Sequence, residues 1–271
     1  MLTDLGEEGR VLAGGQSLVP LMNFRLAQPA HLVDINPVEE LDYVRVDDGS
    51  LAIGARLRQA DLERSDLAAR SAPLLVEALG YVGHPPLRHR GTVCGSVAHA
   101  DPAAEVPAVL TALDAEVVVA ARGGERRVPA VTFASAPFMT VLQPGELVKE
   151  VRIPIGRDAE RRQAFVEVNR RHGDFAVAGA AVSVEVEGAT LRRAAIGLCA
   201  VAGTPVRATR AEEILIGGTG GPEEVEAAAE AAAAALGPPS DLHGSARYRA
   251  GIARVCVRRA LARALNGPSR P

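Results

Sequence analysis

Two short segments of small residues in the first half of the chain have the composition of main-chain cradles for phosphate. The first glycine segment, Gly14–Ser17, reads GGQS, and the second glycine segment, Thr92–Ser96, reads TVCGS. Glycine lets a phosphate oxygen approach the main chain closely, where backbone N–H groups can bind it. Either segment alone could be an ordinary strand-to-helix turn. Two such segments, each beside an apolar run, predict a large cofactor that contains a diphosphate.

Short elements must position these segments. The sequence predicts buried strands at Gly9–Ala13 and Leu32–Ile35, with an apolar helix over Leu18–Leu26 between them. This order is typical of a compact βαβ unit, which would present the first glycine segment at the end of its first strand. A helix over Pro102–Leu113 is expected after the second glycine segment, and Asp101 is placed to cap it.

The remaining pattern divides the chain in two. Its first part holds expected strands at Leu51–Gly54, Glu116–Ala121 and Val148–Ile153 and expected helices at Arg58–Ser65 and Pro73–Leu79. A charged stretch, Gly156–Gln163, has the composition of a linker. Beyond it we expect strands at Ala164–Asn169, Val177–Glu187 and Leu191–Cys199, then helices at Ala208–Ile216, Pro222–Leu236 and Ser245–Leu265. Strands followed by helices predict an α+β second domain.

Composition excludes several classes of function. The 271 residues carry a formal net charge of −3, with no basic stripe that would favour nucleic acid. No apolar run approaches the roughly 20 residues that cross a bilayer, so we expect a cytoplasmic protein without membrane insertion. Cys94, Cys199 and Cys256 are too far apart for a zinc or iron–sulfur motif. No nucleophile elbow, P-loop or dinucleotide-binding glycine fingerprint is present, so hydrolase, nucleotidase and Rossmann interpretations lack support.

Three motifs follow one another along the chain. The first glycine segment continues into LVPLMNFRLA and LVDI, the second continues into VAHADPAAE, and residues 170–176 read RRHGDFA. In this order the motifs resemble the FAD-binding medium subunits of the molybdenum hydroxylases, the family of xanthine dehydrogenase and carbon monoxide dehydrogenase, over nearly the whole chain. The resemblance implies a PCMH-type FAD-binding domain of two α/β subdomains at residues 1–155. It implies a C-terminal domain of antiparallel sheet plus helices at residues 162–267, and an α+β class overall.

The resemblance also implies a set of cofactor contacts. Residues 12–19 would line the pyrophosphate and adenosine side of non-covalently bound FAD, and the second glycine segment would hold the other side of the diphosphate. The implied cofactor-binding residues are Ala13, Gly14, Gly15, Gln16, Ser17, Leu18, Val82, Thr92, Val93, Cys94, Gly95, Ser96, His99, Asp101, Glu105 and Val148. No catalytic acid or base and no metal ligand is assigned.

Several of these residues have a second interpretation. Glu105 is expected to meet the ribityl hydroxyls of FAD and Asp101 to cap a helix, yet both could be acids that only stabilise a helix start. Val82 and Val148 lie either beside the flavin rings or in the core. His99 is expected to be a polar loop residue that contacts the cofactor or a partner.

Cys94 departs from the family pattern, which usually has glycine there. If its φ angle is positive, the Cβ atom costs roughly 1–2 kcal/mol and weakens FAD binding. We do not expect a redox role, because no Lys or Arg adjoins Cys94 to lower its thiol pKa. Arg170, Arg171 and Asp174 are either a solvated turn or a signature that supports the flavin pocket.

Relatives carry a strand and a helix ahead of the first glycine segment, which here begins soon after Met1. We therefore expect that the start is misplaced or that the protein is truncated. Loss of a strand would expose a sheet edge.

The implied function is electron transfer within a complex. Substrate would be oxidised on a molybdopterin-binding large subunit, and electrons would cross [2Fe-2S] clusters on a small subunit. FAD on this chain would collect them for an external acceptor. Two alternatives stay open at this point: a free-standing FAD-dependent oxidoreductase of the cell-wall reductase type, and a degenerate scaffold that no longer binds flavin.

Overall fold

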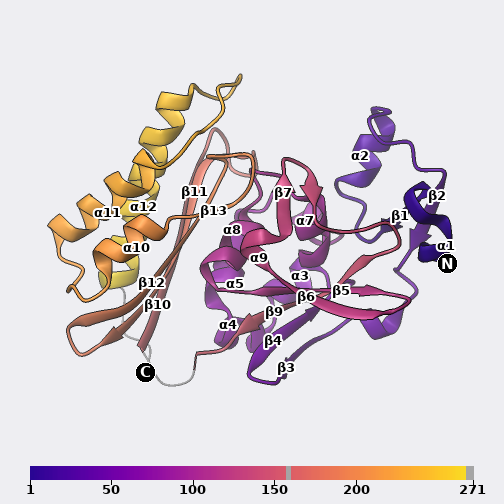
Figure 1. Ribbon diagram of the computed structural model, residues 1–271, viewed down its shortest axis with the longest axis horizontal. Helices are drawn as coiled ribbons and strands as arrows, with labels where there is room; N and C mark the ends of the chain where they lie inside the picture. The colour runs from indigo at the N-terminus through magenta and orange to yellow at the C-terminus, as the bar shows by residue number, and fades with distance from the viewer. Residues whose placement is uncertain (157–159, 267–271) are drawn as a thin grey trace.

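The structure, a computed structural model, describes residues 1–156 and 160–266. After a short helix, α1 (Leu2–Leu5), the chain forms two parallel strands, β1 (Gly9–Leu12) and β2 (His31–Asp34), joined by helix α2 (Leu18–Asn23). The expected βαβ unit is therefore confirmed. Figure 1 shows this unit at one end of an elongated molecule, with the C-terminal helices at the other.

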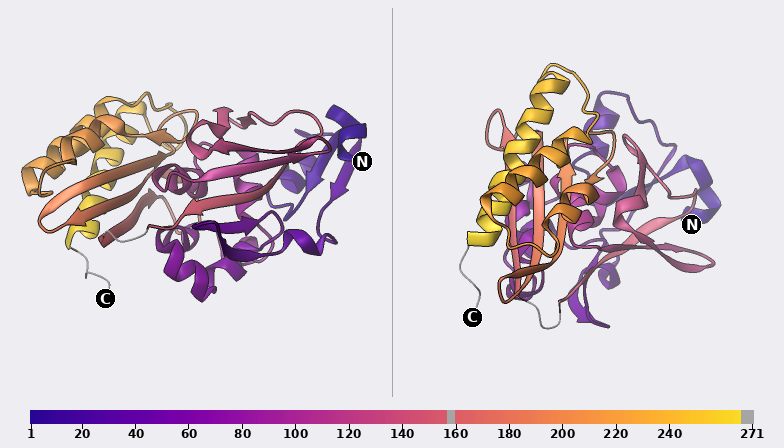
Figure 2. Two further views of the ribbon diagram at one scale, coloured as in Figure 1. Left: turned by 60° about the horizontal axis from the view of Figure 1, so that its bottom comes forward. Right: turned by 60° about the vertical axis from the view of Figure 1, so that its left-hand side comes forward.

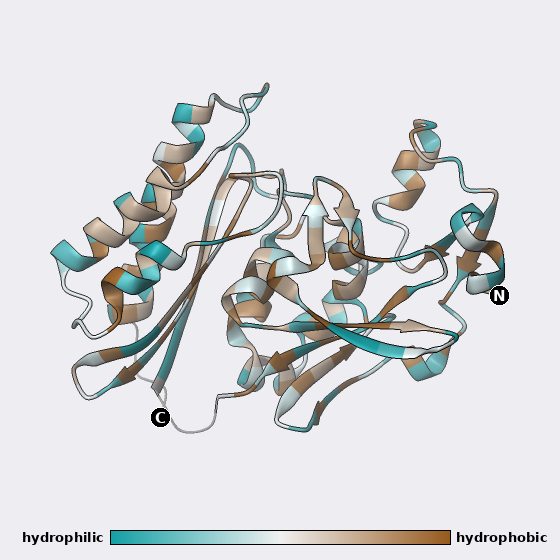
Figure 3. Ribbon diagram, viewed as in Figure 1, coloured by the Kyte–Doolittle hydropathy of each residue, from teal (hydrophilic) through white to brown (hydrophobic). Residues whose placement is uncertain are grey.

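A five-stranded antiparallel sheet forms the centre of the molecule. Its order is β3 (Val44–Asp47), β4 (Ser50–Gly54), β9 (Leu147–Pro154), β5 (Glu116–Ala121) and β6 (Gly124–Pro129). The three inner strands match the sequence predictions, whereas the two edge strands were missed. Strand β6 is exposed at every position except Val128 and is mostly hydrophilic in Figure 3, so it lacks the apolar pattern that predicts a strand.

Helices pack against this sheet and connect it to the rest of the chain. They are α3 (Gln59–Glu63), α4 (Asp66–Ser71), α5 (Pro73–Leu79), α6 (Pro85–Arg88), α7 (Val93–His99), α8 (Glu105–Ala112) and α9 (Ala130–Phe133), followed by the hairpin β7 (Ala134–Ala136) and β8 (Met139–Thr140). Every residue of α8 is buried, because this helix contacts α5 and also the second sheet.

The second sheet is antiparallel, in the order β10 (Glu160–Asn169), β11 (Ala176–Glu187), β12 (Thr190–Cys199) and β13 (Val206–Arg207). The helices that follow are α10 (Thr209–Leu215), α11 (Pro222–Ala234) and α12 (Ala246–Asn266). Figure 2 shows these helices over one face of the sheet, and α8 packs against the other face. Strand β11 is consequently buried along its first nine residues. The expected antiparallel sheet with helices is confirmed.

Several predicted boundaries were wrong, among them the end of the first helix, which lies at Asn23 and not at Leu26. The helix expected over Pro102–Leu113 begins only at Glu105, because the N–H of Ala104 donates to the carbonyl of Asp101 and closes a turn there, with Pro102 at its second position. The expected linker Gly156–Gln163 overlaps β10, which begins at Glu160; residues 157–159 lie outside the described residues.

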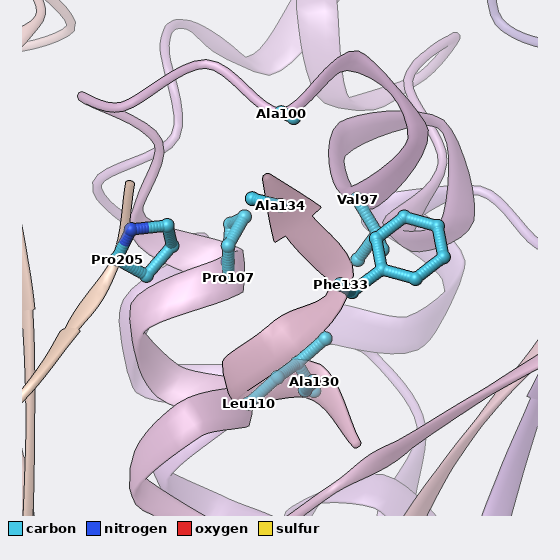
Figure 4. A pocket seen from close by; sticks show the side chains of 8 residues that line it. All are labelled: Val97, Ala100, Pro107, Leu110, Ala130, Phe133, Ala134 and Pro205. Carbon is cyan, nitrogen blue, oxygen red and sulfur yellow. The ribbon is translucent and has the colours of Figure 1, made fainter. Parts of the chain in front are cut away.

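Hydrogen bonds and apolar contacts join the second sheet to the helices of the first part of the chain. Arg207 Nη1 donates to the carbonyl of Thr111 at 2.7 Å, and the rings of Tyr81 and Phe165 meet edge to face, 5.2 Å apart. A small apolar cavity of about 10 Å³ lies at this junction, where Figure 4 shows Phe133 and Pro205 among its lining side chains. A cavity of this size holds at most one water molecule.

Because α8 is buried, shortening one of its core side chains should lower the free energy of unfolding substantially. Leu110 is fully buried in this helix, so Leu110→Ala should lower the free energy of unfolding by about 2–5 kcal/mol. Leu242→Ala is the matched control, because Leu242 is 96% exposed. Urea unfolding followed by circular dichroism measures both, and equal losses for the two variants would contradict the described packing.

Candidate functional site

A pocket of about 310 Å³ lies beside the first glycine segment. Its lining residues come from the end of β1, the first glycine segment, α2, the chain after β2 and the chain before α7: Leu12, Ala13, Gly14, Gly15, Gln16, Val19, Pro20, Asn36 and Arg90. Four of the predicted cofactor-binding residues, those from Ala13 to Gln16, therefore line one pocket. Ser17 and Leu18 adjoin it in the chain without lining it.

The first glycine segment leaves main-chain donors available. Within the described part of the chain, the N–H groups from Gly14 to Leu18 donate to no protein acceptor. The first N–H group beyond them, that of Val19, donates to the Gly15 carbonyl at 3.0 Å. Gly15 has a φ angle of 72°, a left-handed conformation that suits glycine. Consecutive free N–H groups of this kind form an anion-binding concavity.

The two glycine segments come together because one glycine has no side chain. A Cβ atom on Gly14 would lie 2.1 Å from the carbonyl oxygen of Arg90 and 2.9 Å from the Cα atom of Gly91. No real side chain tolerates those distances. The main chain that enters the second glycine segment therefore packs directly against the first.

The second glycine segment is not a loop, which corrects the expectation. Thr92 is the N-cap of α7, and its Oγ1 accepts the N–H of Gly95 at 2.9 Å. Val93, Cys94, Gly95 and Ser96 form the first turns of that helix. None of these residues lines the pocket; Arg90, just ahead of them, does.

Cys94 carries no strain and no reactive thiol. Its backbone is part of α7 and is absent from the residues with positive φ, so the expected conformational penalty at this position was wrong. The thiol is buried, with Sγ 3.6 Å from the carbonyl oxygen of Ile53. Burial, reinforced by the charge of Glu150, raises the pKa of the Cys94 thiol. The side chain is a core residue.

Three further predicted residues fall outside the pocket. His99 ends α7 and its ring packs against Phe138, 5.2 Å between centroids; burial lowers the pKa of this imidazole. Val148 is 6% exposed and belongs to the core, the alternative interpretation given above. Val82 is half-buried against the same core.

Asp101 does not cap α8, which corrects a second expectation. The N-cap residue of α8 is Ala104, and no side chain caps this helix. The Oδ1 atom of Asp101 accepts the N–H of Ala103 at 2.8 Å instead. Asp101 thus stabilises the turn between α7 and α8.

Glu105 belongs to a buried acid pair that the sequence did not predict. It lies in the first turn of α8, 7% exposed, and interacts electrostatically with Glu167 of β10. Oε1 of Glu167 accepts the amide of Asn169 at 3.1 Å, whereas its Oε2 is buried without a hydrogen-bond partner among the described residues. Burial raises the pKa of both carboxyl groups, and the charge of Glu105 raises the pKa of Glu167 further. The pair lies where α8 meets β10, at the junction of the two parts of the chain.

The RRHGDFA motif contacts the first part of the chain. It forms the turn between β10 and β11, in which the Asp174 N–H donates to the Arg171 carbonyl at 3.0 Å. A Cβ atom on Gly173 would lie 2.6 Å from the imidazole of His84, and the rings of His84 and His172 lie 6.1 Å apart. The motif is therefore a contact between the two parts and not only a solvated turn.

Three residues that sequence analysis missed hold the pocket together. Arg58 donates to the Arg90 carbonyl and to Oδ1 of Asn36, and the Asn36 amide donates to the Ala13 carbonyl at 3.0 Å. For Arg90, its position next to the second glycine segment was the one sequence feature that could have indicated a place in the pocket. The other two become recognisable only when the strands are placed.

The described residues include neither a membrane-spanning helix nor a cluster of metal ligands. No helix among residues 1–156 and 160–266 is both long and apolar enough to span a bilayer. Nor does that part of the chain contain a group of three or more His, Cys, Asp or Glu residues that could hold a metal ion.

Comparison with known proteins identifies two matching domain families. Residues 1–156 match the FAD binding domain in molybdopterin dehydrogenase, and residues 163–264 match the CO dehydrogenase flavoprotein C-terminal domain. Between them the two families account for nearly the whole chain.

Individual relatives agree with this. The alpha subunit of the 6-hydroxypseudooxynicotine dehydrogenase complex of Paenarthrobacter nicotinovorans is 44% identical, over 98% of this chain and 90% of that protein. The carbon monoxide dehydrogenase medium chain of Hydrogenophaga pseudoflava is 38% identical, over 96% of this chain and 91% of that one. A solved structure of carbon monoxide dehydrogenase from H. pseudoflava superposes with a TM-score of 0.94 at 40% identity, covering 97% and 91% of the two chains.

The acid pair predicts how stability depends on pH. The pKa is raised from 4.5 to about 7 for Glu105 and to about 8 for Glu167, so the folded state binds more protons than the unfolded state within this range. The free energy of unfolding should therefore fall as pH rises from about 5 to 8. Glu167→Gln removes one titrating group and its charge beside Glu105, which should make that fall shallower.

Urea unfolding at a series of pH values measures this slope. Glu213→Gln, a change at an exposed position of α10, is the control and should keep the wild-type slope. A Glu167→Gln protein with an unchanged slope would show that the pKa of Glu167 is not raised in the folded state.

Proposed function

The chain belongs to the family of FAD-binding medium subunits of the molybdenum hydroxylases, and we propose that it is the electron-transfer subunit of such a complex. In this proposal the chain holds FAD where electrons from iron–sulfur clusters of a partner chain reach it and leave for an external acceptor. FAD supplies the one- and two-electron redox chemistry when it is bound. The protein's own task is to bind FAD, to orient it and to shield it from solvent.

One observation carries the proposal: the free N–H groups of Gly14 to Leu18 lie beside a pocket whose far wall is the chain entering α7. Main-chain donors that are fixed before the ligand arrives need no reorganisation to bind phosphate oxygens. Gln16 is tied to the main chain, because its amide donates to the Gly14 carbonyl at 2.9 Å. The first glycine segment is thus a preformed anion site.

We assign the remaining predicted residues to roles around this site. Thr92 keeps the first turn of α7 in place through its cap, so that Gly95 and Ser96 face the far side of the diphosphate. Asp101 and Glu105 follow α7 along the chain, and we assign them to the ribityl side of the cofactor.

We further propose a division of the chain that matches these tasks. Residues 1–155 form the FAD-binding domain and residues 162–267 form the C-terminal domain. The partners are a molybdopterin-binding large subunit, which carries the molybdenum cofactor and binds the substrate, and a small subunit with [2Fe-2S] clusters. Support comes from relatives whose names describe subunits of dehydrogenase complexes.

The close approach of Gly14 to the main chain of Arg90 and Gly91 allows FAD binding to be tested by a single substitution. Gly14→Ala forces the Ala13–Gly14 and Arg90–Gly91 backbones apart, so FAD affinity should fall by about tenfold or more, as for loss of about 1.4 kcal/mol or more of binding energy. Gly123→Ala is the matched control, because nothing lies within 4 Å of a Cβ atom there. Quenching of flavin fluorescence on titration measures both dissociation constants.

Three outcomes discriminate the candidate functions. A wild-type chain that binds no FAD would be a scaffold, and the proposal would fail. A chain that binds FAD and oxidises a substrate without other chains would be a free-standing oxidoreductase. Co-purification of FAD-loaded protein with a molybdenum-containing large chain and an iron–sulfur small chain is the result that the proposal predicts.

A further inference from the structure

The pocket beside the first glycine segment has one charged side chain. Of its nine lining residues only Arg90 carries a charge. A diphosphate diester carries two negative charges, whereas the main-chain donors of Gly14 to Leu18 are neutral. A guanidinium group supplies the compensating charge together with planar donors that suit phosphate oxygens.

Among the described residues, the side chain of Arg90 has no protein partner, whereas two nearby arginines do. Arg88, two residues earlier, is buried and donates to Glu63 and to the carbonyls of Val82 and Gly83. Arg56 pairs with Asp42 at 3.1 Å. The guanidinium of Arg90, in contrast, makes no hydrogen bond or ion pair with any residue in ranges 1–156 and 160–266, while it lines the pocket.

Arg58 fixes the main chain that carries this cation. Its Nη1 donates to the Arg90 carbonyl at 2.6 Å, and its Nη2 donates to Oδ1 of Asn36. Asn36 in turn donates to the Ala13 carbonyl at 3.0 Å, directly before Gly14. Arg58 therefore ties the two walls of the pocket together without lining the pocket itself.

We propose that Arg90 is the cation that pairs with the FAD diphosphate, and that Arg58 is a positioning residue that holds the Arg90 backbone against the first glycine segment. This inference rests on the proposed function. It assigns different tasks to two neighbouring arginines: one binds the cofactor through its side chain, and the other acts through hydrogen bonds to the protein.

Affinity measurements on the full chain separate these tasks. Arg90→Gln should weaken FAD binding by about ten- to a hundredfold, as expected for loss of a charge-assisted contact. Riboflavin, which lacks the diphosphate, should bind wild type and variant equally. Added KCl should weaken FAD binding more in wild type than in Arg90→Gln, because only the wild-type contact is screened. Arg90→Lys should recover part of the loss.

A double-mutant cycle tests the role of Arg58. Arg58→Gln should weaken FAD binding in the wild-type background and have much less effect when Arg90 is already Gln. A purely structural role would give the same loss in both backgrounds. Arg64→Gln, at an exposed arginine paired with Asp61, is the control and should leave FAD affinity unchanged.

The outcomes also separate this inference from the proposed function. If wild-type protein does not bind FAD, the proposed function fails. If wild type binds FAD and Arg90→Gln binds it equally tightly, or loses riboflavin to the same extent as FAD, the role of Arg90 is overturned. Additive losses from Arg58→Gln and Arg90→Gln would overturn the positioning role of Arg58.

Discussion

The site depends on one steric constraint, the contact between Gly14 and the main chain at Arg90 and Gly91. A carbonyl oxygen occupies the space where any other residue would carry its Cβ atom. Because this contact exists, two segments far apart in the sequence become opposite walls of one pocket. The βαβ unit supplies one wall, and the chain that enters α7 supplies the other. Hydrogen bonds through Arg58 and Asn36 then maintain the spacing.

The rest of the fold keeps the second wall in place. Helix α7 is short, but it contacts β9 and α8, and Cys94 anchors it in the core. Helix α8 is buried on all sides between the two sheets, so it connects the pocket to the C-terminal part. The Glu105–Glu167 pair lies at that connection. Burial raises the pKa of both carboxyl groups, so this junction between α8 and β10 should be sensitive to pH.

Sequence reasoning succeeded where a segment has a strong period or clear boundaries. Strand β5 was placed at both ends from its valine run, and α5 from Pro73 at its first position and its apolar side chains. Helix α7 was missed because Val, Gly, Ser and His are weak helix formers; the Thr92 cap and burial stabilise it instead. Asp101 was misassigned because the turn at Pro102 delays the start of the helix by three residues, so that Ala104 occupies the capping position.

The pocket itself was only half predictable. Local composition identified the first glycine segment. A short run of glycine, a small hydroxyl residue and an amide is itself typical of a turn that binds phosphate. Arg58 and Asn36 owe their roles to hydrogen bonds between residues far apart in the sequence. Nothing in their immediate neighbours indicates a partner, so only the folded arrangement reveals them.

Amide hydrogen exchange is the most direct measurement of the central claim, which is that the backbone N–H groups of the first glycine segment hold the diphosphate. Exchange at residues 14–18 should slow by about tenfold or more when FAD is added, because free donors become hydrogen-bonded. Exchange at the exposed turn of residues 122–124 should not change. If residues 14–18 exchange equally fast with FAD bound and without it, the diphosphate is held elsewhere and the account is contradicted.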